Sequence, residues 1–252
     1  MKEIISNYQD ALDIRDKLAS KQTNGWHFLY RGHASINFKL LSMVGRKKPF
    51  DSNILNSEQR CLNEFKDLVK VENWLQFKII SYNEDMYYMS IGRHLGLDCR
   101  LLDWSASLNT ALYFASFDKE YSEKDGHLWV MCYPKSVNDS NAKLDPFRVD
   151  KFTLVKEDYW SIDDIPINNQ PLGIARRFSQ NGFFIITPTK QLTKPLDELD
   201  IGEVHLFSFI ITQNAKEDIR NHLYQYYDKL YLSTTCSIEN DIKEINCKYF
   251  KQ

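Results

Sequence analysis

The sequence predicts an α+β fold: one domain with a mixed, largely antiparallel central sheet flanked by helices. Two observations predict it. Aromatic and β-branched runs of strand length recur along the chain between segments with the 3.6-residue periodicity and end signals of helices. The 252 residues are 43% hydrophobic, which is enough to bury one sizeable core. Because no repeat, low-complexity tract or linker divides the chain, we expect a single domain over residues 1–252.

The first elements follow from end signals and apolar runs. Asn7 is placed to cap a helix that ends before Gly25. The aromatic-rich run 26–30 predicts a buried strand that ends at Arg31 and Gly32. Residues 33–56 read as a loop, and Asn56 with Gln59 resembles a capping box that starts the next helix.

The middle of the chain carries the most distinctive pattern. A helix is predicted to start at Ser81 and to end at Gly96, a residue suited to a left-handed cap. A short strand over 99–102 leads through Asp103-Trp104-Ser105 into a helix with a buried stripe of Leu108, Ala111, Leu112 and Ala115.

The remaining elements are strands and one long helix. Apolar runs predict strands over 126–133, 182–187 and 204–211, and Asn214 caps the final long helix. Residues 134–170 are polar and irregular, which in a compact domain is typical of a binding loop, lid or insertion.

Composition excludes several functional classes. Thirty-two Lys plus Arg against 34 Asp plus Glu leave a net charge of −2, so the whole molecule has no basic field for nucleic acid or anionic membranes. The N-terminus lacks the apolar run of a signal peptide and no stretch has the length of a membrane helix, so we expect a cytoplasmic protein without a membrane partner. Five scattered cysteines argue against a disulfide framework or a zinc site.

Common catalytic motifs are also absent. The sequence has no Walker loop, no Gly-x-Gly-x-x-Gly, no His-Glu-x-x-His and no Gly-x-Ser-x-Gly. These absences disfavour the common ATP-binding, Rossmann, zinc-protease and hydrolase classes.

Three groups of special residues remain, and together they resemble a known family. The groups are Tyr30-Arg31-Gly32-His33, the block 92–105, which contains His94, Gly96 and Arg100-Leu101-Leu102-Asp103-Trp104-Ser105, and the run Ala111-Leu112-Tyr113-Phe114-Ala115. They resemble the signatures of the FRG-domain family, with core motifs over residues 26–118, and the later run 177–183 resembles that family's Arg-x-x-x-Gln-x-Gly-x-Phe element. The C-terminal strands and helices, 172–252, would complete the same domain. This chain has Tyr30 in place of the usual Phe and His33 where Gln is frequent, and Asp98-Cys99 stands where the family tends to have Pro-Thr.

The order of these residues also resembles the Arg-Ser-Glu group of ADP-ribosyltransferases, so the fold is expected to be similar to theirs. The matching catalytic residues are Arg31, Ser105 and Gln180. The resemblance implies that the arginine holds the phosphates and ribose of NAD, that the serine orients the nicotinamide side, and that the third residue stabilises the sugar cation. NAD would be the substrate, and no metal is implied. A bidentate guanidinium suits a diphosphate, and an oxocarbenium-like transition state needs electrostatic stabilisation at the sugar.

The expected ligand contacts extend beyond these three residues. We assign them to Tyr30, Arg31, Gly32, His94 and Trp104, with Arg100 and Asp103 as supporting residues. Trp104, Tyr30 or Phe184 could supply a stacking surface for a base. Gln180 can bind a ribose hydroxyl but cannot act as a general base, and Glu203 is an alternative acid.

Each of these residues also has a purely structural interpretation. Arg31 could be a buried arginine paired with Asp103, and Arg100 with Asp103 could form an internal ion pair that shapes the loop. His94 could be a core histidine, Ser105 a helix cap, and Gln180 an ordinary polar residue before a strand. If the site is real, Arg31, Asp103 and Arg100 should cluster at the C-terminal ends of adjacent strands.

Three functional hypotheses result. The first is an NAD-using ADP-ribosyltransferase or NAD glycohydrolase, acting as a toxin or antiviral defence effector, with a protein or nucleic acid as acceptor. The second is a non-catalytic module that binds a nucleotide, a nucleic acid or a protein. The third, a metal-independent nuclease using His94, Arg31 and His33, ranks last because the chain lacks the carboxylate cluster of two-metal enzymes.

Overall fold

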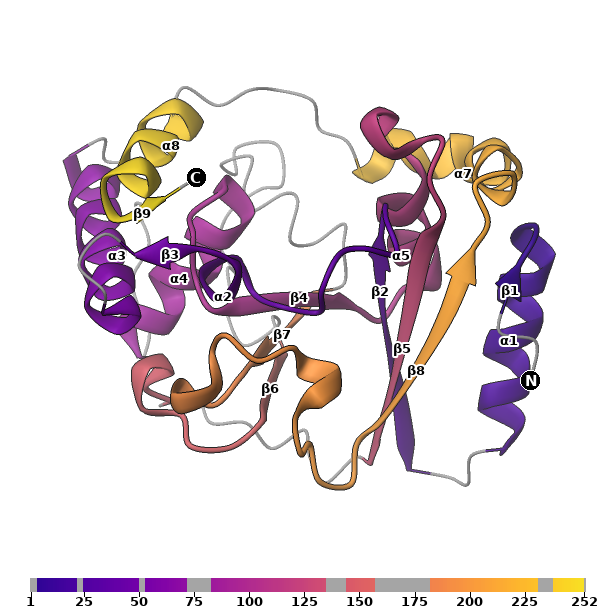
Figure 1. The fold of residues 1–252 in the computed structure, drawn as a ribbon, viewed down its shortest axis with the longest axis horizontal. Coiled ribbons are helices and arrows are strands. Elements are labelled where there is room, and N and C mark those ends of the chain that lie inside the picture. Colours follow the sequence, from indigo (N-terminus) through magenta and orange to yellow (C-terminus); the bar gives the residue numbers. More distant parts are fainter. Residues whose placement is uncertain are drawn as a thin grey trace, which may run out of the picture.

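The fold is a seven-stranded sheet with helices packed at both of its ends (Figure 1). It is seen in a computed structural model that describes residues 4–21, 25–49, 53–71, 83–134, 144–156, 182–230 and 238–251. The strand order is β1-β8-β5-β2-β4-β7-β6, and a separate two-stranded sheet pairs β3 with β9. Neighbouring strands are antiparallel except β1 and β8, which are parallel. The predicted α+β class with a mixed sheet is confirmed.

The strands of the large sheet are β1 (Ile4–Ile5), β2 (Trp26–His33), β4 (Leu101–Ser105), β5 (Gly126–Pro134), β6 (Thr153–Lys156), β7 (Gly182–Ile186) and β8 (His205–Ile211). The small sheet contains β3 (Lys48–Pro49) and β9 (Phe250–Lys251). The α-helices of the described residues are α1 (Tyr8–Lys21), α2 (Met43–Arg46), α3 (Ile54–Val71), α4 (Glu84–Leu95), α5 (Leu108–Ser116), α7 (Ala215–Leu230) and α8 (Ile238–Tyr249). Short 3₁₀ turns include η1 (Lys119–Tyr121) and η3 (Pro146–Arg148).

The large sheet divides into two parts at the junction of β2 and β4. β2 pairs with β5 along its whole length, whereas β2 and β4 share only the pair Tyr30–Ser105. Figure 1 shows β4 running steeply across the direction of β2. The two strands therefore separate beyond Tyr30, and residues on both of them become available to line a cavity.

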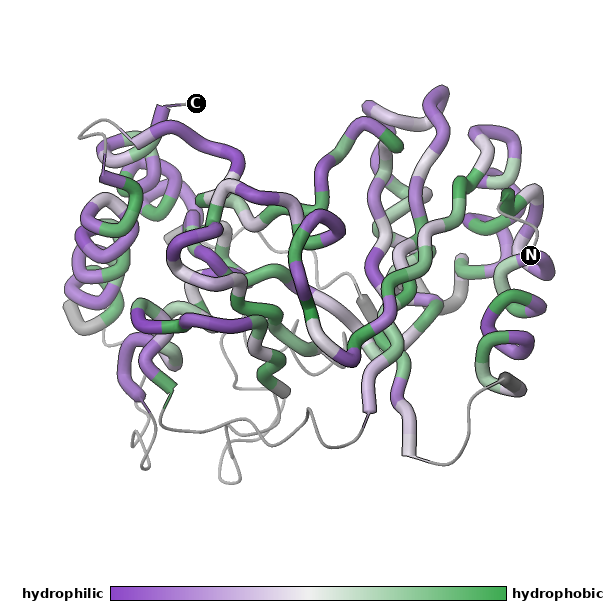
Figure 2. Tube along the Cα trace, turned by 60° about the horizontal axis from the view of Figure 1, so that its bottom comes forward, coloured by the Kyte–Doolittle hydropathy of each residue, from purple (hydrophilic) through white to green (hydrophobic). Residues whose placement is uncertain are grey.

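Each part of the sheet has its own helical cover. Helices α1, α5 and α7 pack on β2, β5 and β8 in a core that includes Tyr30, Leu112 and Phe209. Helices α3, α4 and α8 form a second core with β4 and β7, which includes Leu101 and Phe184. The opposite face carries a third cluster, in which strand residues pack against Leu40, Leu196 and Val204 from segments outside the strands. Figure 2 shows hydrophilic and hydrophobic positions alternating along the outer helices, as expected of helices with one buried face.

Several local signals from the sequence hold in the structure. The side chain of Asn7 accepts a hydrogen bond from the Asp10 backbone N–H at 2.9 Å and so caps α1. Gly96 ends α4 with φ of 97°, in the left-handed region that favours glycine. Helix α7 begins directly after Asn214, as predicted.

Other boundaries differ from the predictions. Helix α3 begins at Ile54, and Asn53 rather than Asn56 accepts the hydrogen bonds of its first turn. Strand β4 begins at Leu101 and includes Asp103-Trp104-Ser105, which were predicted to follow the strand. From the sequence alone, polar residues such as Asp103 and Ser105 favour a loop, because the side chains on other elements that pair with them are not known. Strand β6 lies in the region predicted to be irregular, and β1, β3, β9 and α8 were not predicted.

None of the helices in the described ranges is long and apolar enough to span a membrane.

Candidate functional site

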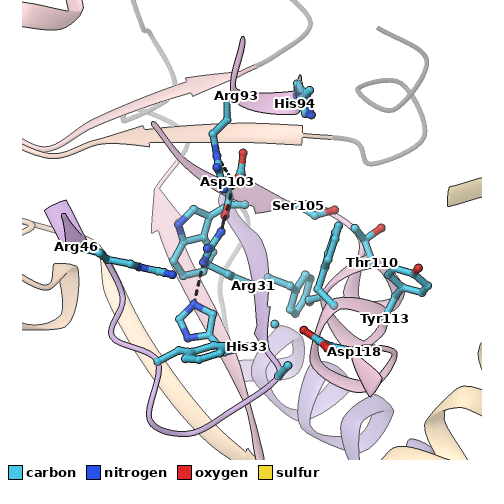
Figure 3. A pocket seen from close by; sticks show the side chains of 17 residues that line it. Arg31, His33, Arg46, Arg93, His94, Asp103, Ser105, Thr110, Tyr113 and Asp118 are labelled. Atoms are coloured by element: carbon cyan, nitrogen blue, oxygen red, sulfur yellow. Dashed lines mark hydrogen bonds and ion pairs between the residues drawn. The ribbon is translucent and has the colours of Figure 1, made fainter. Parts of the chain in front are cut away.

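A cavity of about 460 Å³ opens where β2 and β4 separate (Figure 3). Its walls come from β2 and the loop that follows it, from β4, and from the facing ends of α4 and α5. The lining residues are Tyr30, Arg31, Gly32, His33, Ala34, Phe38, Arg46, Arg93, His94, Asp103, Trp104, Ser105, Thr110, Ala111, Tyr113, Phe114 and Asp118. A concave site of this volume is typical of a small-molecule pocket.

Close packing of β2 on α5 forms one wall of the cavity. A Cβ atom on Gly32 would lie 1.8 Å from the carbonyl oxygen of Ala111 and 2.9 Å from the backbone nitrogen of Ala115. Both obstacles are backbone atoms, so no side-chain rotation could make room for it. Gly32 therefore lets α5 approach β2 and brings Thr110, Tyr113 and Phe114 to the cavity.

At the centre of the cavity wall, one carboxylate lies between two arginines. Asp103 Oδ2 accepts hydrogen bonds from Arg93 Nε at 2.8 Å and Nη2 at 2.5 Å, and it lies 3.7 Å from Arg31 Nη1. Arg31 Nη1 also donates to the backbone oxygen of Asp103 at 2.5 Å. Burial alone would raise the pKa of Asp103, but the charges of Arg93 and Arg31 outweigh burial and leave that pKa lowered. The carboxylate is therefore held in its charged form.

Burial and like charge act on the arginines themselves. Burial lowers the pKa of Arg31 to about 10; Asp103 opposes this shift, and Arg93 and Arg46 add to it. Arg31 is still charged at neutral pH. Burial and the charge of Arg93 also lower the pKa of Arg46. The three cations are thus close enough to repel one another around a single central carboxylate.

Arg46 reaches the cavity from α2 and is fixed by its own loop. Its Nε donates to the Leu41 carbonyl at 3.0 Å and its Nη2 to the Lys39 carbonyl at 3.2 Å. Figure 3 shows its guanidinium extending toward the group formed by Arg31 and His33. The guanidinium is therefore oriented without any ligand.

Unused hydrogen-bond donors outnumber unused acceptors in the cavity wall. Within the described part of the chain, Arg31 Nη2, Arg46 Nη1 and Arg93 Nη1 make no hydrogen bond. The buried Trp104 Nε1 and His33 Nδ1 also have no partner there. Among the acceptors, Asp103 Oδ1 makes no hydrogen bond within the described ranges, and the buried Thr110 hydroxyl, also without a partner there, can either donate or accept one. Because buried polar groups normally have partners, this surplus favours a ligand rich in acceptor oxygens.

The rest of the cavity wall is aromatic and weakly polar. Phe38, Tyr113 and Phe114 line it, and the Phe114 side chain is 47% exposed although it is large and apolar. Asp118 lies at the exposed edge, where its Oδ1 accepts the backbone N–H of Glu120 at 3.1 Å and caps η1. A phosphate group and an aromatic base could therefore both be accommodated.

Seven of the predicted site residues line this cavity. They are Tyr30, Arg31, Gly32, His94, Asp103, Trp104 and Ser105. His94 is partly exposed, and its ring lies 5.8 Å from that of Phe184. The hydroxyl of Ser105 accepts the Ser107 backbone N–H at 3.0 Å, and Ser107 rather than Ser105 caps α5.

The predicted pairing of Arg100 with Asp103 is wrong. Arg100 is fully buried and binds Glu58 of α3, with Nη2 2.6 Å from Oε2 and Nε 3.0 Å from the same oxygen. It also donates to the Pro146 carbonyl at 2.7 Å. Side chains three positions apart along an extended segment point to opposite sides, so Arg100 and Asp103 face different surroundings. The predicted cluster therefore contains Arg31 and Asp103 but not Arg100. It also does not lie at the ends of the strands, because Arg31 and Asp103 are interior positions of antiparallel strands.

Two further candidates are not among the described residues that line the cavity. Gln180 lies outside the described residues. Glu203 is exposed and lies two residues before β8, whose first residue, His205, pairs with Cys132, and Cys132 in turn pairs with Phe28 near the start of β2. That end of the sheet is opposite to Arg31, so Glu203 does not supply an acid to this cavity. Phe184, a predicted stacking surface, is buried in the core beneath His94.

Sequence reasoning missed Arg93 and Arg46, the other two arginines of the cavity. Arg93 directly precedes His94 in the signature block, and it could have been proposed from its place in the last turn of α4, beside the motif. No local signal marks Arg46, which belongs to a region predicted to be a loop.

His33 is not placed to act as the base of a nuclease. It is 4% exposed, and its Nε2 accepts the Arg31 Nε–H at 3.1 Å. Among the described residues there is also no group of three or more His, Cys, Asp or Glu side chains placed to hold a metal ion.

Comparison with known proteins gives one family match. Residues 26–124 match the FRG domain. This range contains every residue that lines the cavity. Searches of curated proteins and of solved structures return no match.

Proposed function

We propose that this cavity, which several signature residues of the matched FRG domain line, binds NAD and that the protein cleaves it, as an ADP-ribosyltransferase or NAD glycohydrolase does. The observation that carries the proposal is the surplus of donors: three arginines surround one carboxylate, and each keeps a terminal nitrogen without a partner among the described residues.

The phosphates of a dinucleotide suit this donor set. Phosphate oxygens accept the short, charge-assisted hydrogen bonds that guanidinium groups donate, and planar guanidiniums favour two-pronged contacts. In the proposal, Arg31 and Arg46 bind the diphosphate, because their orientation is already fixed by other contacts. Such preorganisation lowers the entropic cost of binding.

The sugar and the bases would occupy the remaining walls. Asp103 Oδ1 is an open acceptor for a ribose hydroxyl, and the exposed ring of Phe114 offers a stacking surface. Trp104 is only 3% exposed, so it would contribute its indole N–H rather than a stacking face.

The proposed reaction breaks the bond between nicotinamide and ribose. Nicotinamide leaves with the bonding electron pair, the cationic ribose carbon adds water or an acceptor nucleophile, and that nucleophile loses a proton. Positive charge develops on the sugar, so a nearby carboxylate or amide lowers the barrier. Ser105 and Gln180 are proposed to act at this step. A cytoplasmic location, expected from the sequence, would give access to NAD, and consumption of NAD would suit a toxin or defence effector with a protein or nucleic acid as acceptor.

A specific observation favours a second candidate, a nucleotide-binding module without catalysis. Asp103 is bound by two arginines, and Asp118 caps η1 at the exposed edge. Of the described lining residues, none therefore offers a carboxylate that is uncommitted and close to the cavity centre. Under this candidate NAD or another nucleotide would bind but would not be turned over.

Calorimetric titration with NAD and an assay of nicotinamide release separate these possibilities. We expect the wild type to bind NAD, Arg31→Ala to abolish binding and Arg31→Lys to restore it only in part, because an ammonium cannot make the planar contact. Gln180→Ala should spare binding and lower turnover. Arg148→Met is the control, since its side chain is 87% exposed and lies outside the cavity.

Each outcome has a clear meaning. Binding without nicotinamide release supports the second candidate. No binding of NAD by a folded wild type contradicts the proposal.

A further inference from the structure

Two contacts fix the guanidinium of Arg31. Its Nε donates to His33 Nε2 at 3.1 Å, and its Nη1 donates to the Asp103 backbone oxygen at 2.5 Å. A planar group held at two nitrogens has little freedom to rotate, so its third nitrogen, Nη2, keeps a fixed direction. Figure 3 shows Arg31 between His33 and Asp103, with the contact to His33 drawn as a dashed line.

The contact with His33 requires one protonation state of the imidazole. Nε2 can accept a hydrogen bond from Arg31 only when it carries a lone pair, so the neutral ring must bear its hydrogen on Nδ1. Within the described ranges the buried Nδ1 makes no hydrogen bond of ordinary geometry, although the Phe38 backbone acts to raise the pKa of the ring, as an acceptor beside a ring N–H does. A charged imidazolium would place N–H against N–H and break the contact.

The surroundings of His33 keep it neutral. The ring is 4% exposed and packs edge-on against Phe38, with centroids 6.1 Å apart. The charged or titratable groups that act on it are Arg31 of the same strand, Arg46 at the end of α2 and His127 opposite it on β5. None of these groups is an acid. Burial, with these positive groups, lowers the pKa of His33 to about 2.

We infer that His33 is a positioning residue: as a neutral Nδ1–H imidazole it holds Arg31 in the orientation that binds the anionic part of the ligand. The inference deepens the proposed function and rests on it for the identity of the anion. A neutral acceptor suits this position because a carboxylate would neutralise Arg31 and a cation would repel it. Glutamine, which offers a neutral carbonyl acceptor on a side chain of similar reach, should therefore replace His33.

Three variants separate a role of His33 in holding Arg31 from a role of its ring in packing. His33→Phe keeps an aromatic ring beside Phe38 but removes the acceptor. His33→Gln restores a neutral acceptor without the ring. His127→Phe is the matched control, because His127 pairs with His33 across β2 and β5 and does not line the cavity.

The first measurement uses the ligand-free protein. Nitrogen-15 NMR of the imidazoles and of the arginine Nε–H groups should show His33 with a protonated Nδ1 and a bare Nε2 from pH 8 to pH 5. The Arg31 Nε–H signal should shift in His33→Phe. A His33 ring that becomes charged near pH 6, or an Arg31 signal unchanged in His33→Phe, would overturn the inference.

The second measurement is the dissociation constant for NAD and for inorganic pyrophosphate, by calorimetry. His33→Phe should weaken both by about tenfold or more, the equivalent of one charged hydrogen bond, and His33→Gln should restore both to within about threefold of wild type. His127→Phe should bind as the wild type does. Equal binding by His33→Phe and wild type would contradict the inference, and so would failure of a folded His33→Gln to restore binding.

The experiments distinguish failure of the proposed function from failure of the proposed role of His33. If the wild type binds neither NAD nor pyrophosphate, the proposed function fails and with it the anion-binding role of His33. In that case the NMR measurement still decides whether His33 holds Arg31. If the wild type binds pyrophosphate but not NAD, the role of His33 is still decided by the variants, and only the identity of the ligand is wrong.

Discussion

Replacing Arg100 with methionine should strongly destabilise the fold although Arg100 lies outside the cavity. The Arg100 and Glu58 side chains are 0% and 1% exposed. The substitution removes the guanidinium that binds both oxygens of Glu58. Of the donors among the described residues, the carboxylate then keeps only the Arg100 backbone N–H, at 2.7 Å. It also removes the donor to the Pro146 carbonyl and to the Thr189 hydroxyl. An uncompensated buried charge of this kind costs ~3–5 kcal/mol.

Urea denaturation followed by circular dichroism measures this loss from the transition midpoint and slope. The double variant Arg100→Met with Glu58→Met should recover part of the loss, because no buried charge is then left unpaired. Arg148→Met, at an exposed ion pair, should change the free energy of unfolding by less than ~1 kcal/mol. A loss below ~1 kcal/mol in Arg100→Met, or a double variant less stable than the single one, would refute the reasoning.

Five further predictions concern the cavity wall and the residues that support it. Gly32→Ala should cost ~3 kcal/mol by the same assay, the upper end of the usual cost of overpacking, because the new methyl group meets the Ala111 backbone. A cost under ~1 kcal/mol would show that α5 can move. Asp103→Ala should cost roughly 1–3 kcal/mol, less than a fully buried pair because Asp103 is 30% exposed, and an unchanged melting curve would contradict this. The lowered pKa of Asp103 implies that its contribution is present above about pH 4 and lost as pH falls below that, so Asp103→Asn should flatten the acid end of the stability curve. His33 is neutral in the folded protein, whereas in the unfolded chain it becomes protonated below about pH 6.5. It should therefore lower the free energy of unfolding by ~2 kcal/mol as the pH falls from 7 to 5. His33→Gln should remove this pH dependence, and an unchanged pH dependence would count against a neutral His33. Lys216→Met should lower the melting temperature, because the buried Lys216 ammonium donates to the Ala34 carbonyl at 2.7 Å and to the Tyr121 carbonyl at 2.6 Å. An unchanged melting temperature would show that these two hydrogen bonds do not stabilise the fold.

Local features of the fold were predictable because their causes lie within a few residues. The cap at Asn7 and the left-handed glycine at Gly96 each depend on one residue and its immediate neighbours. The apolar runs that became β5, β7 and β8 could be read from their composition. The need for glycine at position 32 could be suspected from the motif, but its cause, the backbone of α5, is visible only in the packed structure.

The partners of charged side chains were much harder to predict. Arg100 binds Glu58, 42 positions away, because topology brings α3 beneath the start of β4. Asp103 was assigned to Arg100 by proximity in sequence, whereas its bidentate partner is Arg93 on α4. Pairing across elements depends on the whole fold, so the sequence placed Arg31 and Asp103 together but could not find Arg46.

The most direct test of the account is a crystal structure of the protein with NAD. The account predicts the diphosphate between the guanidiniums of Arg31 and Arg46, with a ribose hydroxyl on Asp103 Oδ1 and the Arg31–His33 contact retained. NAD bound elsewhere on the molecule, or bound here with its diphosphate turned away from both arginines, would contradict it.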